Sequence, residues 1–261
     1  EMTRLYEIEL EKARFARELQ MARQVQESLL PQQMPDISGW QFDRRWNPIH
    51  DVSGDFYDVI QEGPQRLGLV TADVTDKGMP ASLFMAFVRS ALRASITRSA
   101  TPSRVLTNAN RVICQDSYRG LFATLFYARL NTASGELVYA NAGHPPAILY
   151  RRAQDDLLLL TRTGMSLGVD MGTPYTHQAV QLEEGDFILF YTDGIIEAAN
   201  PDGQEFGLDR LKSEVFSRRN CPAAELLDDL EKTLAAHTYP NTVGDDVTLM
   251  MVRRLDQNAK K

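Results

Sequence analysis

The chain has 261 residues, 43% of them hydrophobic, which is ample for a sizeable core in one large domain or in one domain with an appendage. Its formal net charge of −7 argues against nucleic acid as a partner, because binding a phosphate backbone needs a basic surface. Its two cysteines, Cys114 and Cys221, are too few for a disulfide framework or a zinc cluster, so we expect a reducing, cytoplasmic setting.

The chain begins with Glu1 rather than methionine, and no signal peptide opens it. It contains no apolar run near the roughly 20 residues that a membrane helix needs. We therefore expect a fragment of a longer protein, whose missing part could carry targeting information such as an upstream membrane anchor.

Residues 1–31 are predicted to form a linker or regulatory helix. Positions recur at steps of three and four along one stripe, namely Leu5, Ile8, Lys12, Phe15, Leu19, Ala22, Gln26 and Leu29. So narrow a seam is more typical of a coiled coil than of a helix packed on a globular core, which stays the alternative. Polar Lys12 and Gln26 would help to fix its register. We expect a homodimer through this helix, which should end at Pro31.

The residues after this helix predict strands followed by a pair of helices. Residues 40–46 alternate between apolar and polar side chains, and residues 55–60 follow a Ser-Gly turn, so each stretch predicts a strand. An apolar run at 67–71 predicts a buried strand that runs out near Asp73. Pro80 suits the first turn of a helix, because its missing N–H would have no intrahelical partner there. The expected helices are 81–96 and about 102–116.

From residue 121 the chain changes to short strands separated by turn residues, which is typical of an antiparallel meander. Two more helices are expected at about 208–217 and 223–237, before a last strand at 247–253. This order of strands and paired helices predicts an α+β sandwich in which helical layers cover sheets.

Acidic residues adjoin glycine or a long apolar strand at four places, namely Gly54-Asp55, Ala72-Asp73, Asp193-Gly194 and Gly244-Asp245-Asp246. Oxygen ligands on separate strands suit a hard cation such as Mg²⁺ or Mn²⁺, and not zinc, which prefers histidine and cysteine. Bound metal would relieve the repulsion between the carboxylates, and two metals could bridge a hydroxide and clamp a phosphoryl oxygen. Four independent Asp/Gly turns remain the alternative.

Other residues that could take part in phosphoryl chemistry are ambiguous. Neither Cys114 nor Cys221 has an arginine placed to wrap a phosphate, so both are predicted to be structural. His144 lies in a Gly/Pro turn and could donate a proton or contact the substrate, although loop hydrogen bonds are the favoured explanation. Lys77 could attract phosphate from beside Asp73 or be a solvated turn residue.

Five stretches together resemble the PPM-type (protein phosphatase 2C-like) serine/threonine phosphatases, in the SpoIIE/RsbU branch. They are GDFYD at 54–58, ADVTDKGMPASL at 72–83, NAGHPPA at 141–147, YTDGIIEA at 191–198 and GDDVTLMMVR at 244–253. The resemblance implies a phosphatase domain at 32–255, a tail at 256–261, and an α-β-β-α sandwich of two antiparallel sheets flanked by helices. It also implies two divalent metal ions, Mn²⁺ or Mg²⁺.

Carried over by position, the resemblance implies catalytic metal ligands at the acidic stretches. These are Asp55, Asp73, Asp193 and Asp245, with the Val74 carbonyl contributing and Asp246 as a neighbour that could also bind. The usual second glycine before the first of these acids is Ser53 here, which removes no ligand. The phosphate-binding arginine and general-acid histidine of eukaryotic relatives are not matched in this chain.

The implied activity is hydrolysis of phosphoserine or phosphothreonine on a regulatory protein, with a phosphorylated STAS-domain anti-anti-sigma factor as the expected substrate. An upstream sensory domain, joined through the leading helix, is also implied. Two other functions stay open on the sequence alone. One is a nucleotide cyclase-like domain, which would also pair strand-borne acids with two metals behind a coiled coil, and the other is a non-catalytic binding module.

Overall fold

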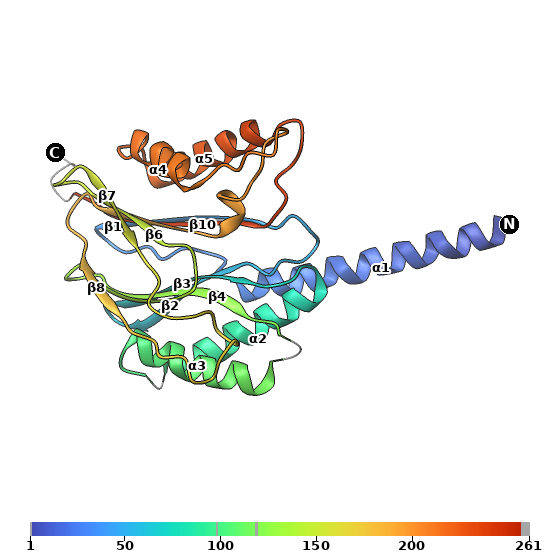
Figure 1. Cartoon of the computed structure of the whole chain (residues 1–261), viewed down its shortest axis with the longest axis horizontal. Coiled ribbons are helices and arrows are strands. Elements are labelled where there is room, and N and C mark those ends of the chain that lie inside the picture. Colours follow the sequence, from blue (N-terminus) through green and yellow to red (C-terminus); the bar gives the residue numbers. More distant parts are fainter. Residues whose placement is uncertain (1, 98, 118–119, 257–261) are drawn as a thin grey trace.

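The computed structural model describes residues 2–97, 99–117 and 120–256, which fold into a sandwich of two antiparallel sheets between two helical layers (Figure 1). The first sheet, in spatial order, contains β1 (Trp40–Asn47), β10 (Val247–Arg254), β9 (Phe187–Tyr191), β6 (Ala147–Arg151) and β7 (Asp156–Leu160). The second contains β2 (Phe56–Gly63), β3 (Arg66–Val74), β4 (Ala123–Asn131), β5 (Glu136–Ala142) and β8 (Gln178–Gln181). The expected α-β-β-α sandwich is confirmed.

Two pairs of helices close the outer faces of the sheets (Figure 1). They are α2 (Met79–Ile96) and α3 (Pro102–Asp116) on the second sheet, and α4 (Leu208–Ser217) and α5 (Ala223–Thr238) on the first. As expected, Pro80 lies in the first turn of α2. The buried residues of α2 include Ala81, Met85, Val88 and Leu92, which recur every three or four positions and so form one apolar stripe against the sheet.

Strand alternation divides the buried side chains among three apolar layers. In β9, Ile188 and Phe190 belong to the layer between the sheets, whereas Phe187, Leu189 and Tyr191 pack with α4 and α5. Phe190 meets Phe126 of β4 edge to face, with 5.3 Å between ring centroids. Since both faces of β9 are covered, this strand is rigidly held, and so is the start of the turn that follows it.

The leading helix α1 (Met2–Leu29) extends away from the sandwich and meets it near the helix end (Figure 1). Phe15 is 60% exposed, Leu19 is half-buried and Gln26 is buried. The expected helix is confirmed, and its pairing with a second copy stays a prediction. The assignment of Gln26 to the coiled-coil register is corrected, because its amide is bonded to the backbone of Ser53 within the same chain. No helix in the described part of the chain is long and apolar enough to cross a membrane.

Candidate functional site

The acidic residues singled out in the sequence gather at one end of the sandwich, where strands of both sheets begin or end. Asp55 directly precedes β2, and Asp73 is the next-to-last residue of β3. Asp193 opens η1 (Asp193–Ile195), the short 3-10 helix after β9, and Asp245 and Asp246 directly precede β10. The two sheets therefore bring together carboxylates that lie up to 191 positions apart in the chain (55 to 246). We call these five residues the acidic centre.

Asp55 is the most deeply placed member of the acidic centre, with 2% of its surface exposed. Its Oδ2 accepts hydrogen bonds from the hydroxyls of Thr192, at 2.6 Å, and Thr248, at 2.7 Å. Thr192 and Thr248 also exchange backbone and side-chain bonds with each other, so they tie the ends of β9 and β10 together. Both threonines adjoin the acidic motifs in the sequence, yet the pattern analysis assigned them no role.

Two glycines let the acid-bearing turns approach each other. A Cβ at Gly54 would lie 2.8 Å from the carbonyl oxygen of Val74, the atom implied as a metal ligand by the family resemblance. A Cβ at Gly194 would lie 1.9 Å from the carbonyl oxygen of Asp246. Because real Cβ atoms do not come so close to backbone oxygens, only glycine allows these turns to pack as they do.

Burial and mutual repulsion shift the pKa values of the acidic centre upward. The pKa of Asp55 lies well above its ordinary range, mainly because of burial and then because of the neighbouring Asp73. Burial, followed by repulsion from Asp193, raises the pKa of Asp73 to about 7. Burial and the charge of Asp245 also raise the pKa of Asp193. The centre thus holds more negative charge than its own surroundings can stabilise.

Asp246 is engaged with the loop between β1 and β2. Its Oδ1 accepts from the backbone N–H of Ile49 at 2.7 Å, and its Oδ2 accepts from the Ser53 hydroxyl at 2.5 Å and the Gly54 N–H at 3.3 Å. The Gln26 amide binds both backbone polar groups of Ser53, at 2.6 and 2.9 Å. These contacts connect the end of α1, through Ser53, to the turn that carries Asp55, a connection that sequence reasoning missed.

Lys77 and His144, the two tentative substrate contacts, have different surroundings. The ammonium group of Lys77 lies 3.0 Å from Oδ2 of Asp245 and donates to the Gly244 carbonyl at 3.1 Å. His144 is buried, and its Nδ1 is 2.7 Å from the Thr124 hydroxyl. Burial lowers the pKa of His144 to about 3, so the ring is neutral at physiological pH. These contacts favour the loop-stabilising role for His144 and leave Lys77 beside the acids.

The donor set of the acidic centre fits a hard divalent cation. Its side-chain donors are carboxylate oxygens, which Mg²⁺ and Mn²⁺ prefer, and its excess negative charge would attract such an ion. Within the described ranges, no three acidic, histidine or cysteine side chains already enclose a single point. Binding an ion would therefore draw the carboxylates closer together.

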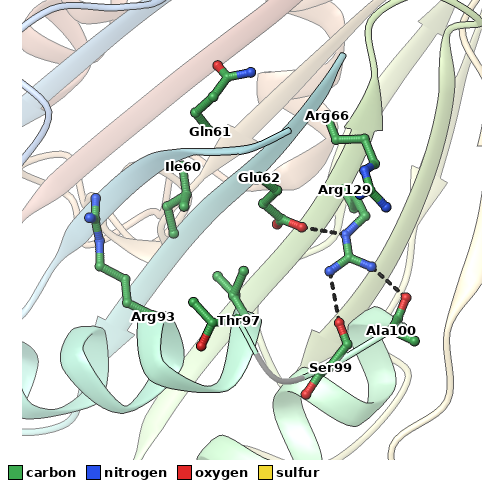
Figure 2. A pocket seen from close by; sticks show the side chains of 10 residues that line it. Ile60, Gln61, Glu62, Arg66, Arg93, Thr97, Ser99, Ala100 and Arg129 are labelled. Carbon is green, nitrogen blue, oxygen red and sulfur yellow. Dashed lines mark hydrogen bonds and ion pairs between the residues drawn. The ribbon is translucent and has the colours of Figure 1, made fainter. Parts of the chain in front are cut away.

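A cavity of about 510 Å³ lies elsewhere in the described structure. It opens near Arg66 at the start of β3, about 23 Å along that strand from Asp73 at the usual rise of 3.3 Å per residue. Figure 2 shows Arg129 in this cavity bound to Glu62 and to the carbonyls of the loop after α2, Ser99 and Ala100. Through these hydrogen bonds, the Arg129 guanidinium holds that loop against the sheet, which is a structural role.

A model of the family described as stage II sporulation protein E (SpoIIE) matches residues 63–255. The chain is 30% identical to protein IcfG of Synechocystis sp. over 264 residues, which cover 91% of this chain and 41% of IcfG. It is also 30% identical to phosphoserine phosphatase RsbU of Bacillus subtilis over 238 residues, covering 91% of this chain and 70% of RsbU. The chain thus spans less than half of IcfG and most of RsbU.

Solved structures share the fold. The SiaA-PP2C domain of Pseudomonas aeruginosa has a TM-score of 0.83 at 21% identity, over 94% of this chain and 98% of that one. The RsbU and RsbW domains of Rv1364c from Mycobacterium tuberculosis have a TM-score of 0.72 at 29% identity, and the match covers 85% of this chain and 61% of that one. The catalytic domain of the serine/threonine phosphatase PstP, in complex with 2 manganese ions, has a TM-score of 0.58 at 15% identity, and the match covers 83% of this chain and 99% of that one. With most of its length matched by the family model and its fold shared with PP2C domains, the chain belongs to the SpoIIE family.

Proposed function

We propose that this chain is the catalytic domain of a metal-dependent protein phosphatase that hydrolyses phosphoserine or phosphothreonine on a regulatory protein. The observation that carries the proposal is the acidic centre, in which burial and repulsion raise the pKa values of Asp55, Asp73 and Asp193. Such a cluster is costly in a protein that has no cation to bind there. The 30% identity to phosphoserine phosphatase RsbU supports phosphate ester hydrolysis over the nucleotide cyclase alternative.

The proposed ligands are Asp55, Asp73, Asp193 and Asp245, with the Val74 carbonyl, around two Mn²⁺ or Mg²⁺ ions. Divalent ions supply Lewis-acid activation of water and of the phosphoryl oxygens. The chain itself orients the ligands, since Thr192 and Thr248 hold one oxygen of Asp55. Both oxygens of Asp246 are already bonded to the loop that carries Asp55. We therefore assign Asp246 a positioning role rather than that of a ligand.

We propose that Lys77 meets the negative charge of an incoming phosphate, because its ammonium group lies 3.0 Å from Oδ2 of Asp245. The proposed substrate is a phosphorylated STAS-domain anti-anti-sigma factor, and the proposed control is an upstream sensory domain acting through α1. Support for a phosphoserine substrate comes from the 30% identity to phosphoserine phosphatase RsbU, and the STAS-domain partner is what the family resemblance implies. Support for the control comes from the Gln26–Ser53 contact, which joins α1 to the turn before Asp55.

The test is release of inorganic phosphate from p-nitrophenyl phosphate and from a phosphoserine protein in Mn²⁺, with and without EDTA. Asp193→Asn should abolish release while the fold stays intact, and Asp202→Asn, at an exposed turn, should leave it unchanged. Full activity in EDTA or in Asp193→Asn would refute the metal mechanism. Incubation with ATP and Mn²⁺ tests the alternative, since a cyclase would form a cyclic nucleotide and pyrophosphate.

A further inference from the structure

An apolar cavity of about 290 Å³ opens beside the acidic centre, between α5 and the loop that follows β1. Its apolar lining comes from Pro48, Ile49, Leu234, Ala235, Val243 and Val247. Asp245 forms part of its wall, so the cavity adjoins the acidic centre. Asp245 also lines a second cavity of about 320 Å³, whose other lining residues include Glu197, Asn200 and Asn241. Asp245 therefore lines both an apolar cavity and a polar one.

The apolar cavity offers hydrophobic surface to solvent and is held in place relative to the acids. Ile49 is 36% exposed at its rim, whereas Leu234 and Val247 are 4% and 3% exposed and belong to the core. The backbone N–H of Ile49 donates to Asp246, which fixes the rim to the acidic centre. The carboxylate of Glu231 already accepts a hydrogen bond from the Asn47 amide and forms an ion pair with Arg45 at 3.5 Å. The cavity therefore has little unpaired charge with which to bind an ionic group.

A phosphoprotein that reaches the acidic centre must place the residues beside its phosphorylated residue close to this cavity. An extended peptide advances about 3.3 Å per residue, so the first three neighbours on either side lie within about 10 Å. None of the described residues that line the cavity is cationic, so nothing there favours an acidic side chain, and the apolar lining favours an aliphatic one. The volume accommodates one large side chain rather than a folded segment.

We infer that this cavity is a specificity subsite, which binds one aliphatic side chain of the phosphoprotein while the phosphorylated residue lies at the acidic centre. The inference rests on the proposed phosphatase function and adds a substrate preference to it. Docking a leucine-sized side chain in such a subsite is worth on the order of 10- to 100-fold in kcat/KM. A substrate without flanking residues gains nothing from it.

The probes are nine-residue phosphoserine peptides that carry leucine or glutamate at one of the three positions on either side of the phosphoserine. p-Nitrophenyl phosphate, which has no flanking residue, is assayed in parallel. Ala235→Trp fills the mouth of the cavity from an exposed position of α5. Ala236→Trp, at the next exposed position and outside the cavity lining, is the matched control. Ile49→Ala removes the apolar rim without removing its backbone bond to Asp246.

The wild type and Ala236→Trp should prefer leucine over glutamate by at least about tenfold at one position. Ala235→Trp should lose this preference, Ile49→Ala should weaken it, and both should hydrolyse p-nitrophenyl phosphate at the wild-type rate. A wild type that hydrolyses p-nitrophenyl phosphate without any peptide preference would overturn the subsite alone. A leucine preference that survives in both Ala235→Trp and Ile49→Ala would also overturn it. The same would follow if these variants lost as much activity on p-nitrophenyl phosphate as on the leucine peptide. A wild type inactive on every substrate with Mn²⁺ would instead overturn the proposed function.

Discussion

Replacing Asp73 with asparagine should stabilise the metal-free protein at neutral and alkaline pH while abolishing its phosphatase activity. Asp73 is one of the proposed ligands, and burial and repulsion from Asp193 raise its pKa from an ordinary 3.8 to about 7. When the pKa of a carboxyl group is higher in the folded than in the unfolded state, the fold is most stable at a pH below the unfolded-state pKa. At that pH the group is protonated in both states, so burying it costs no ionisation free energy. That stability is lost as the pH rises from about 4 to about 7.

The size of the effect follows from the difference between the two pKa values, 7 minus 3.8, or about 3 units. Each pKa unit corresponds to about 1.4 kcal/mol, so ionised Asp73 destabilises the metal-free fold by up to about 4 kcal/mol above pH 7. Asparagine keeps the shape of the side chain and carries no charge. For a chain of this size, each kcal/mol changes Tm by about 2–4 °C, so the variant should melt up to about 8–16 °C higher at pH 8.

The assay is thermal unfolding in EDTA at pH 4.5, 6 and 8, for the wild type, Asp73→Asn and the exposed-turn control Asp202→Asn. The Tm of Asp73→Asn should exceed that of the wild type by a margin that grows from pH 4.5 to pH 8, and the control should follow the wild type. Equal or lower stability of Asp73→Asn at pH 8, or a margin that does not depend on pH, would refute the electrostatic reasoning. Saturating Mn²⁺ should reverse the order, because the wild type gains ligand-binding free energy.

Three further outcomes are expected. Gln26→Met keeps the side-chain volume but removes both hydrogen bonds to Ser53. Mn²⁺-dependent activity should therefore fall several-fold, and amide hydrogen exchange at the end of α1 should rise. Unchanged exchange would contradict the proposed contact. Cys114→Ser and Cys221→Ser should keep most of the activity, since burial raises the pKa of the Cys114 thiol and both cysteines are free; loss of turnover in a folded variant would revive covalent catalysis. Leu19→Asp should abolish any dimer seen by light scattering and change the phosphatase rate in parallel; if neither changes, α1 is only a tether.

Periodicity and turn chemistry were sufficient to predict helical layers that cover sheets, whereas the order of two antiparallel sheets was implied by the family resemblance. The apolar run at 67–71 predicted β3, and the proline signal predicted the start of α2, because these features depend on residues close together in the chain. The acids were found in the sequence for the same reason, since each adjoins a strand end. A heptad-like stripe also predicted a helix at the N-terminus, but not which of its residues meet the domain.

The contacts that shape the acidic centre could not be predicted, because they join residues far apart in the chain. Nothing near Ser53 in the sequence indicates that its hydroxyl bonds to Asp246, 193 positions later. Gln26 fits a coiled-coil register by spacing alone, yet its amide is used by Ser53. The role of the Thr192 hydroxyl depends on the register between β9 and β10, which a single sequence does not reveal.

The pairing of the first strand with the last has a consequence for synthesis of the protein in the cell. β1 and β10 lie side by side from the Trp40–Arg254 pair to the Asn47–Val247 pair, and the latter partners are 200 positions apart in the chain. Contacts of such sequence separation form slowly, and here they also wait for the ribosome to release the last strand. Because Asp245 lies two residues before that strand, the acidic centre is complete only when nearly the whole domain has emerged. The acidic centre therefore cannot assemble until the sandwich closes.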